Sequence, residues 1–172
     1  MLRFIKVLWL MSLLGFLASA LFIYADIGDA NTIVQVKLDS SGESTFGISR
    51  VNFFYSSLFV MLGINVIILL TGYSIPHLPK SMVFAPQKAL WLSTPHNRKN
   101  FYKRMKDWAR GFATIINFFL TCVIFTIYYM NSRNYFPLAW TYYLCAVLAI
   151  AWLFAFFPIF KKNPDLVDTD VR

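Results

Sequence analysis

The chain has 172 residues, of which 58% are hydrophobic and only 14% are charged, and its formal net charge is +8. Soluble domains carry about a quarter charged residues, so this composition argues against an ordinary soluble domain. The apolar residues gather in four long blocks, and the charges fall between the blocks.

Each block is close to the roughly 20 residues that a helix needs to cross a hydrocarbon core about 30 Å thick. The blocks run from about 7 to 24, 51 to 73, 111 to 130 and 138 to 160. They lack the alternation of a transmembrane barrel, and in a bilayer only a helix or a closed barrel satisfies its backbone hydrogen bonds. We therefore predict an all-α integral membrane protein with four transmembrane helices, forming a single membrane domain over residues 1–172.

The first block also has features of a secretory signal peptide. Arg3 and Lys6 precede it, and residues 18–20 read Ala-Ser-Ala, a small-residue pattern like a cleavage site. The apolar run continues past this point, through residues 21–23. We therefore expect an uncleaved first span.

The distribution of Lys and Arg predicts the orientation. Of the sixteen cations, thirteen lie before the first span, between the second and third, or after the fourth. Cationic residues concentrate in loops that stay in the cytoplasm. Both termini, the segment 74–110 and the tail 161–172 are therefore expected in the cytoplasm, and the loop 25–50 on the outer side.

The outer loop contains a hairpin pattern. The run TIVQVKL is β-branched and roughly alternating, DSSGES has turn composition, and TFGIS can return as a second strand. An isolated hairpin is marginally stable in water, so we expect it to pack on the membrane surface, on its own helix ends or on another subunit. The candidate contact residues of this outer hairpin are Val36, Asp39, Gly42 and Glu43.

The cytoplasmic segment 74–110 divides into two parts. Residues 74–95 contain four prolines, which block a continuous helix and predict a structured strap folded back on the membrane. Further on, Phe101, Met105 and Trp108 recur at helical spacing, with cations on another face. This predicts an amphipathic cytoplasmic helix lying along the inner leaflet before it turns into the third span.

Anionic lipid of the inner leaflet is the expected partner of this helix, since it attracts nearby cations. A docking surface for a protein partner is the alternative, and nucleic acid is not expected. The residues assigned to lipid or partner docking are Lys99, Lys103, Arg104, Lys106, Trp108 and Arg110.

Asn65 and Asn117 are polar residues near the middle of the second and third spans. An unpaired amide is costly in lipid, so each should face another helix, and they could face one another. Contact with a partner subunit or a ligand is the alternative.

The sequence offers little chemistry beyond these amides. The spans contain no Asp, Glu, Lys or His, which argues against proton and ion pathways, and His77 and His96 fall outside them, which argues against a transmembrane haem. Cys122 and Cys145 have no zinc-site spacing and are expected to be packing residues. We predict no catalytic residue, cofactor or metal site.

The segment ADIGDANTIVQVKLDSSGESTFGIS resembles the extracytoplasmic loop of a bacterial membrane domain of unknown function, which also occurs in SdpI-type immunity and signalling proteins. The positions that fit its pattern are Val34, Val36, Asp39, Ser41, Gly42 and Glu43 in the loop, and Pro86, Lys88, Trp91 and Arg98 in the strap. Lys37 stands where that family has a histidine, and the leading proline is missing, so the role of that histidine is not carried over. The resemblance implies a bacterial inner-membrane protein and supplies no active site.

A protein with its mass in the bilayer and without catalytic residues is expected to work by contact. We predict an accessory or scaffolding subunit of a larger bacterial inner-membrane complex, with other membrane-protein subunits as partners. One alternative is an SdpI-like immunity or sensory protein. Another is a small-molecule or lipid transporter with a polar cleft around Asn65 and Asn117.

Overall fold

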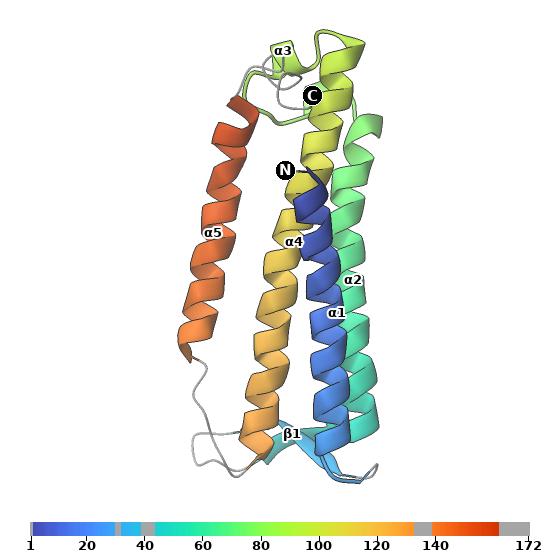
Figure 1. Cartoon of the computed structure of the whole chain (residues 1–172), viewed down its shortest axis with the longest axis vertical. Coiled ribbons are helices and arrows are strands. Elements are labelled where there is room, and N and C mark those ends of the chain that lie inside the picture. The colour runs from blue at the N-terminus through green and yellow to red at the C-terminus, as the bar shows by residue number, and fades with distance from the viewer. Residues whose placement is uncertain (1, 30–31, 39–43, 133–138, 162–172) are drawn as a thin grey trace.

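In the computed structural model, the protein is a bundle of long helices with a β-hairpin at one end and a short strap at the other (Figure 1). The structure describes residues 2–29, 32–38, 44–132 and 139–161. The long helices are α1 (Leu2–Asp26), α2 (Arg50–Ser74), α4 (Pro95–Asn131) and α5 (Ala139–Lys161). All four are long and apolar enough to cross a membrane. The predicted all-α membrane fold is confirmed.

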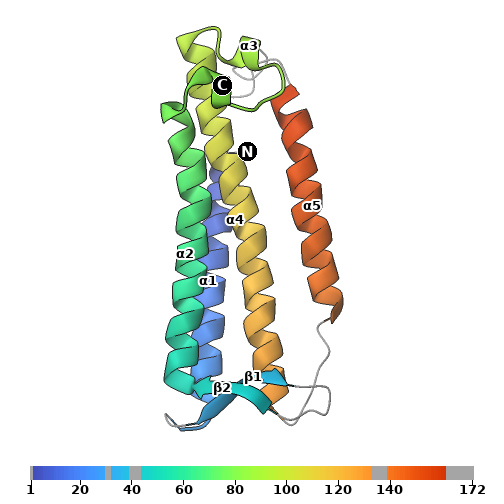
Figure 2. The ribbon, with the colours of Figure 1, turned by 180° about the vertical axis from the view of Figure 1, so that it is seen from behind.

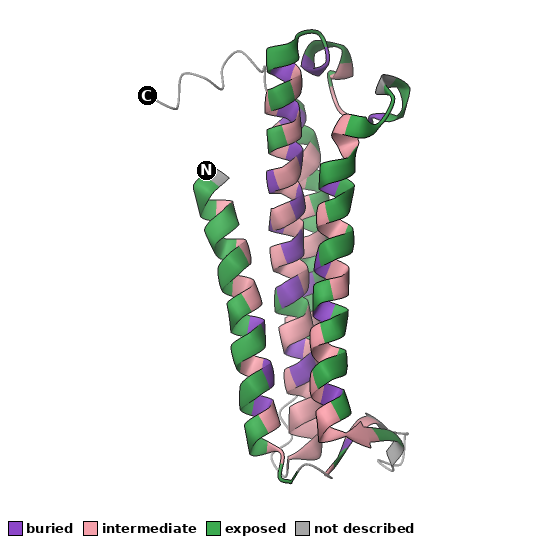
Figure 3. Ribbon diagram, turned by 90° about the vertical axis from the view of Figure 1, so that its right-hand side faces the viewer, coloured by how far each residue is buried: buried purple, intermediate pink, exposed green. Residues whose placement is uncertain are grey.

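Helix α4 is the centre of the bundle. It packs against α1, α2 and α5, and buried residues follow it along its length (Figure 3). Helix α5 rests on α4 and lies apart from α1 and α2 when the bundle is seen from the front or from behind (Figure 2). The bundle therefore consists of a three-helix core with one flanking helix.

Helices α4 and α5 meet along a regular seam. Tyr142, Cys145, Trp152 and Phe156 lie on the α5 side, at the 3–4 spacing that lets two helices interdigitate. The indole of Trp152 lies on Gly111, where an added Cβ would clash with the carbons of the ring. Glycine at this position therefore lets the two helices come close.

The hairpin forms as expected and rests on the helix ends of its own chain. Strand β1 (Ile33–Leu38) pairs antiparallel with β2 (Ser44–Ser49), with an irregularity in register after Gln35. Val34 is fully buried in a cluster with Phe16 and Phe53. Ser49 then caps α2 by accepting a hydrogen bond from the Asn52 N–H, as serine commonly does at a helix start.

The strap is ordered and closes the other end of the bundle. It contains two 3-10 turns, η1 (Ile75–His77) and η2 (Lys80–Met82), and the short helix α3 (Lys88–Trp91). Trp91 is fully buried and packs edge-on against Phe160 of α5. The strap thus packs on the protein as well as connecting two spans.

The predicted amphipathic helix exists, but it is not a separate helix that turns into the third span. Residues 95–131 form one continuous helix, about 55 Å long at 1.5 Å per residue, which exceeds the bilayer core. Thr94 caps it, and Pro95 stands at its first turn, where proline is tolerated. No proline follows within the helix, so it continues without a break.

The apolar face predicted from Phe101, Met105 and Trp108 also contacts a different surface from the expected lipid headgroups. Phe101 is fully buried and Met105 is nearly so, in a cluster with Trp91 and Phe160. This face packs on the strap and α5 rather than in the lipid headgroups, because those two elements supply apolar surface that the sequence pattern alone could not locate.

Candidate functional site

The most distinctive polar site lies in the middle of the three-helix core. Asn65 of α2 and Asn117 of α4 are 4% and 0% exposed, and their amides face each other. Asn65 Nδ2 donates to Asn117 Oδ1, and Asn117 Nδ2 donates back to Asn65 Oδ1 at 3.3 Å. Of the options that the sequence left open, the structure places the two amides against one another.

Two residues of α1 complete this network, and the sequence analysis did not single them out. Trp9 Nε1 donates to Asn65 Oδ1 at 3.0 Å, and Asn117 Nδ2 donates to Ser12 Oγ at 3.0 Å. Trp9 and Ser12 are three residues apart, so they lie on one face of their helix. The available signal was that a buried indole N–H needs an acceptor.

The network binds three helices together and has little capacity left for a ligand. The remaining Asn65 donor reaches the Met61 carbonyl at 2.8 Å, and the Ser12 hydroxyl donates to the Trp9 carbonyl at 2.7 Å. Interhelical hydrogen bonds in membranes average about 0.6 kcal/mol each. The four side chains of this amide network (Trp9, Ser12, Asn65 and Asn117) therefore stabilise the helix arrangement by a few kcal/mol at most.

The basic segment does not present its predicted docking residues on one open face. Only Lys99 and Lys103 are exposed, whereas Arg104, Lys106, Trp108 and Arg110 are half-buried and contact other parts of the protein.

Arg104 is directed at the end of α5. Its Nη1 donates to the Ile159 carbonyl at 2.7 Å, and its guanidinium lies 5.2 Å from the Trp91 ring centroid. The Trp91 indole donates to the neighbouring Phe160 carbonyl at 2.7 Å. Carbonyls in the last turn of a helix lack partners within the helix, and a cation there is favourable. Arg104 and Trp91 thus fix the end of α5 to α4 and the strap.

Trp108 joins the same two helices further along the seam. Its Nε1 donates to the Trp152 carbonyl at 3.3 Å, and Trp152 Nε1 donates to the Trp108 carbonyl at 3.0 Å. The two indoles therefore hold α4 and α5 together.

The last two basic residues contact α2. Lys106 Nζ lies 4.3 Å from the ring centroid of Tyr73, and Arg110 Nη2 donates to the Tyr73 hydroxyl at 3.2 Å. Arg110 also forms an ion pair with Asp107, at 2.9 Å between Nη1 and Oδ1. Asp107 is 5% exposed, and its other oxygen has no hydrogen-bond partner. The sequence analysis did not select this acidic residue.

At the hairpin end, side chains from the helices hold the loop. The amide of Asn131 accepts from the Gln35 N–H at 2.7 Å and donates to the Gln35 carbonyl at 2.9 Å, as a neighbouring strand would. Arg50 donates to the carbonyls of Tyr24 and Gly28, at the end of α1.

Among the candidate residues of the outer hairpin, Val36 packs against the core, while Asp39, Gly42 and Glu43 lie outside the described residues.

The two cysteines lie in a different part of the molecule from the two histidines. Cys122 and Cys145 are free and buried in the helix bundle. His96 Nε2 lies 3.0 Å from Asn100 Nδ2, and His77 is the last residue of η1 in the strap. Over the residues that the structure describes, no group of three His, Cys, Asp or Glu side chains could hold a metal ion.

Comparisons of this chain with protein-family models, with curated proteins and with solved structures find no match.

Proposed function

We propose that this protein is an accessory or scaffolding subunit of a larger membrane complex and performs no catalysis itself. In this proposal it lies in the bacterial inner membrane with both termini in the cytoplasm, and it acts by contacting other subunits. The strong bias of cations toward one side of the spans supports the orientation.

The observation that carries the proposal is the outward face of α5. Tyr143, Val147, Ile150 and Phe154 are 69, 61, 54 and 68% exposed, and they recur at alternating spacings of four and three residues. The face that α5 packs on α4 has the same kind of spacing, which suits interdigitation with another helix. Since α5 packs on α4 alone among the long helices, apart from marginal contacts, this outward face is open to a partner helix (Figure 1).

The amide network supports a scaffold over a transporter. A transporter that used Asn65 and Asn117 would need these amides to line a polar cleft. Both are buried, and they hydrogen-bond to each other and to α1. Their polar groups hold the helices in fixed positions. A subunit that contacts its partners through its outer surface needs such a fixed arrangement of helices.

The test is to tag the C-terminus, extract the protein in a mild lipid-preserving detergent and identify co-purifying proteins by mass spectrometry. A stoichiometric membrane-protein partner is expected. The double variant Val147→Ala, Phe154→Ala should reduce its recovery, because these side chains would fill the interface. The matched control is Phe59→Ala, Val66→Ala on α2, where the replaced side chains are 79 and 54% exposed.

Recovery of the wild-type protein as a clean monomer or homo-oligomer would refute the subunit proposal. Equal loss of the partner from both double variants would show that α5 is not the docking face.

A further inference from the structure

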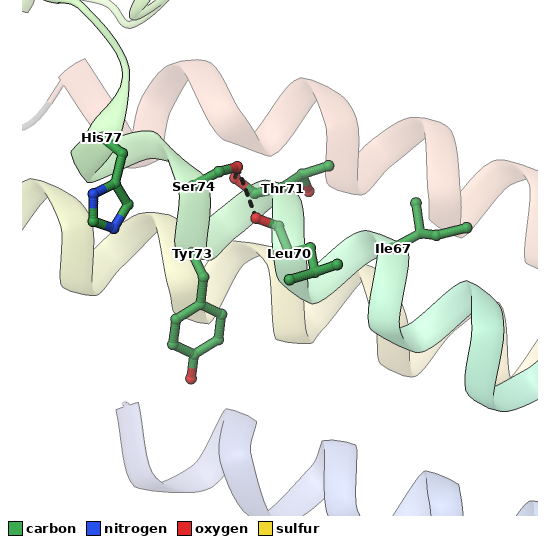
Figure 4. Close-up of a pocket in the computed structure, with 6 residues that line it drawn as sticks. All are labelled: Ile67, Leu70, Thr71, Tyr73, Ser74 and His77. Atoms are coloured by element: carbon green, nitrogen blue, oxygen red, sulfur yellow. Dashed lines mark hydrogen bonds between the residues drawn. The ribbon is translucent and has the colours of Figure 1, made fainter.

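A hollow along α2 near the strap is lined by residues of that helix and of η1 (Figure 4). Ile67 and Leu70 make part of it apolar, and the hydroxyls of Thr71 and Ser74 donate to carbonyls of α2 itself. These polar groups therefore serve the helix. Another pocket, at the hairpin end of the bundle, instead brings polar groups together from separate elements.

This hairpin-end pocket encloses about 250 Å³ between the end of α1, the loop before β1 and the end of α4. Drug-sized ligands occupy pockets of about 300–1,000 Å³, so it suits a smaller group. Asp26 is exposed, and a ligand can therefore reach its carboxylate from outside. The polar lining comes from Asp26, Gly28, Thr32, Tyr128, Asn131 and Ser132.

The side-chain donors of α4 that line this pocket are already used. Tyr128 Oη donates to Asp26 Oδ2 at 2.6 Å. Asn131 Nδ2 donates to the carbonyls of Gln35 and Ile127, at 2.9 and 2.7 Å. An amide nitrogen has two protons, so these two bonds exhaust it.

The neighbouring donors follow the same pattern. The Ser132 hydroxyl donates to the Tyr129 carbonyl at 3.1 Å, and the Gly28 N–H donates to the Asp26 carbonyl at 2.9 Å. The Thr32 hydroxyl can either donate or accept. A carboxylate has about four acceptor sites, of which Tyr128 uses one on Asp26. The pocket therefore offers a ligand mainly acceptors.

The charge and the depth of the pocket restrict the ligand further. Among the described residues that line it, Asp26 is the only charged side chain, and Arg50 is directed at the carbonyls of Tyr24 and Gly28. Asp26 is also the first charged residue after the apolar stretch 7–24. The pocket therefore lies at the boundary of the hydrocarbon core, at the level of the lipid headgroups.

We propose that this pocket binds the primary ammonium headgroup of an aminophospholipid, with the Asp26 carboxylate and the Tyr128 oxygen accepting its N–H groups. An ammonium has three donors and no acceptor, which matches a negative pocket whose own donors are used. Its hydrogen bonds to a carboxylate are charge-assisted and therefore strong. The position at the membrane boundary favours a lipid headgroup over a free amine. This site does not depend on the proposed subunit role.

The experiment is native mass spectrometry of the full chain, released from detergent with phosphatidylethanolamine or phosphatidylcholine added. The two lipids share their phosphate and acyl chains, but the choline nitrogen carries three methyl groups and no N–H. The test variant is Asp26→Asn, which keeps the size of the side chain and an acceptor for the Tyr128 hydroxyl. The matched control is Asp29→Asn, which removes the same charge three residues further along, at a residue that does not line the pocket.

We expect phosphatidylethanolamine to be retained in preference to phosphatidylcholine. Asp26→Asn should weaken its binding about tenfold, because hydrogen bonds to a charged acceptor are lost, with little change in Asp29→Asn. Tyr128→Phe, which removes one acceptor and no charge, should weaken it less.

Equal retention of the two lipids by the wild-type protein would overturn the ammonium assignment. Equal effects of Asp26→Asn and Asp29→Asn would overturn the site in favour of diffuse attraction. Displacement of phosphatidylethanolamine by free ethanolamine at the same concentration would overturn the lipid assignment, because a soluble amine would then suffice.

Discussion

Replacing Asn117 with alanine tests whether the amide network holds the three-helix core together. The substitution removes three interhelical hydrogen bonds, two with Asn65 and one with Ser12. At about 0.6 kcal/mol each, the expected loss in free energy of unfolding is about 2 kcal/mol, before any cost of the cavity. Asn65→Ala should cost a similar amount, because it removes the same two bonds and the bond from Trp9.

The double variant makes the test quantitative. Since the two bonds between the amides are shared, the sum of the single costs counts them twice, and the double variant should cost about 1 kcal/mol less than that sum. The assay is equilibrium unfolding in mixed micelles, titrated with a denaturing detergent. Thr121→Val serves as the control, because the Thr121 hydroxyl donates within its own helix, to the Asn117 carbonyl.

A sum of single costs that equals the double-variant cost, to within the usual additivity error of about 0.3–0.5 kcal/mol, would refute the shared network. Coupling of Thr121→Val to Asn65→Ala as strong as that of the amide pair would refute it too, because it would show a general softening of α4.

Three further predictions concern other parts of the chain. Gly111→Ala should destabilise the protein by about 1–3 kcal/mol, because its Cβ would meet the Trp152 ring, whereas Gly15→Ala, with no atom within 4 Å, should leave the melting temperature unchanged or raised. Asn131→Ala should increase protease cleavage between 27 and 49, because it removes both hydrogen bonds to β1, while Asn131→Asp, which keeps the acceptor, should have a smaller effect. Fused to the C-terminus, green fluorescent protein should fluoresce and alkaline phosphatase should be inactive; the reverse pattern would contradict the cation-based orientation.

The sequence by itself determined the helical spans and the hairpin. Four apolar blocks of bilayer length have few alternatives, because backbone groups in lipid must be satisfied within a helix. The hairpin followed from two β-branched runs around a turn sequence. The sequence also indicated that Asn65 and Asn117 need partners, because an unpaired amide in the membrane interior is costly.

Only the tertiary structure decided which helix faces meet. The spans are apolar on nearly every side, so their sequences mark no single buried face, and the partners of Trp9, Ser12 and Gly111 could not be identified. The sequence also could not show that the Phe101 face contacts protein, because a periodic pattern shows that a face is apolar but does not distinguish lipid from protein as its neighbour. The strap and α5 supply the apolar surface that buries this face, because the fold brings them beside α4 from distant parts of the chain.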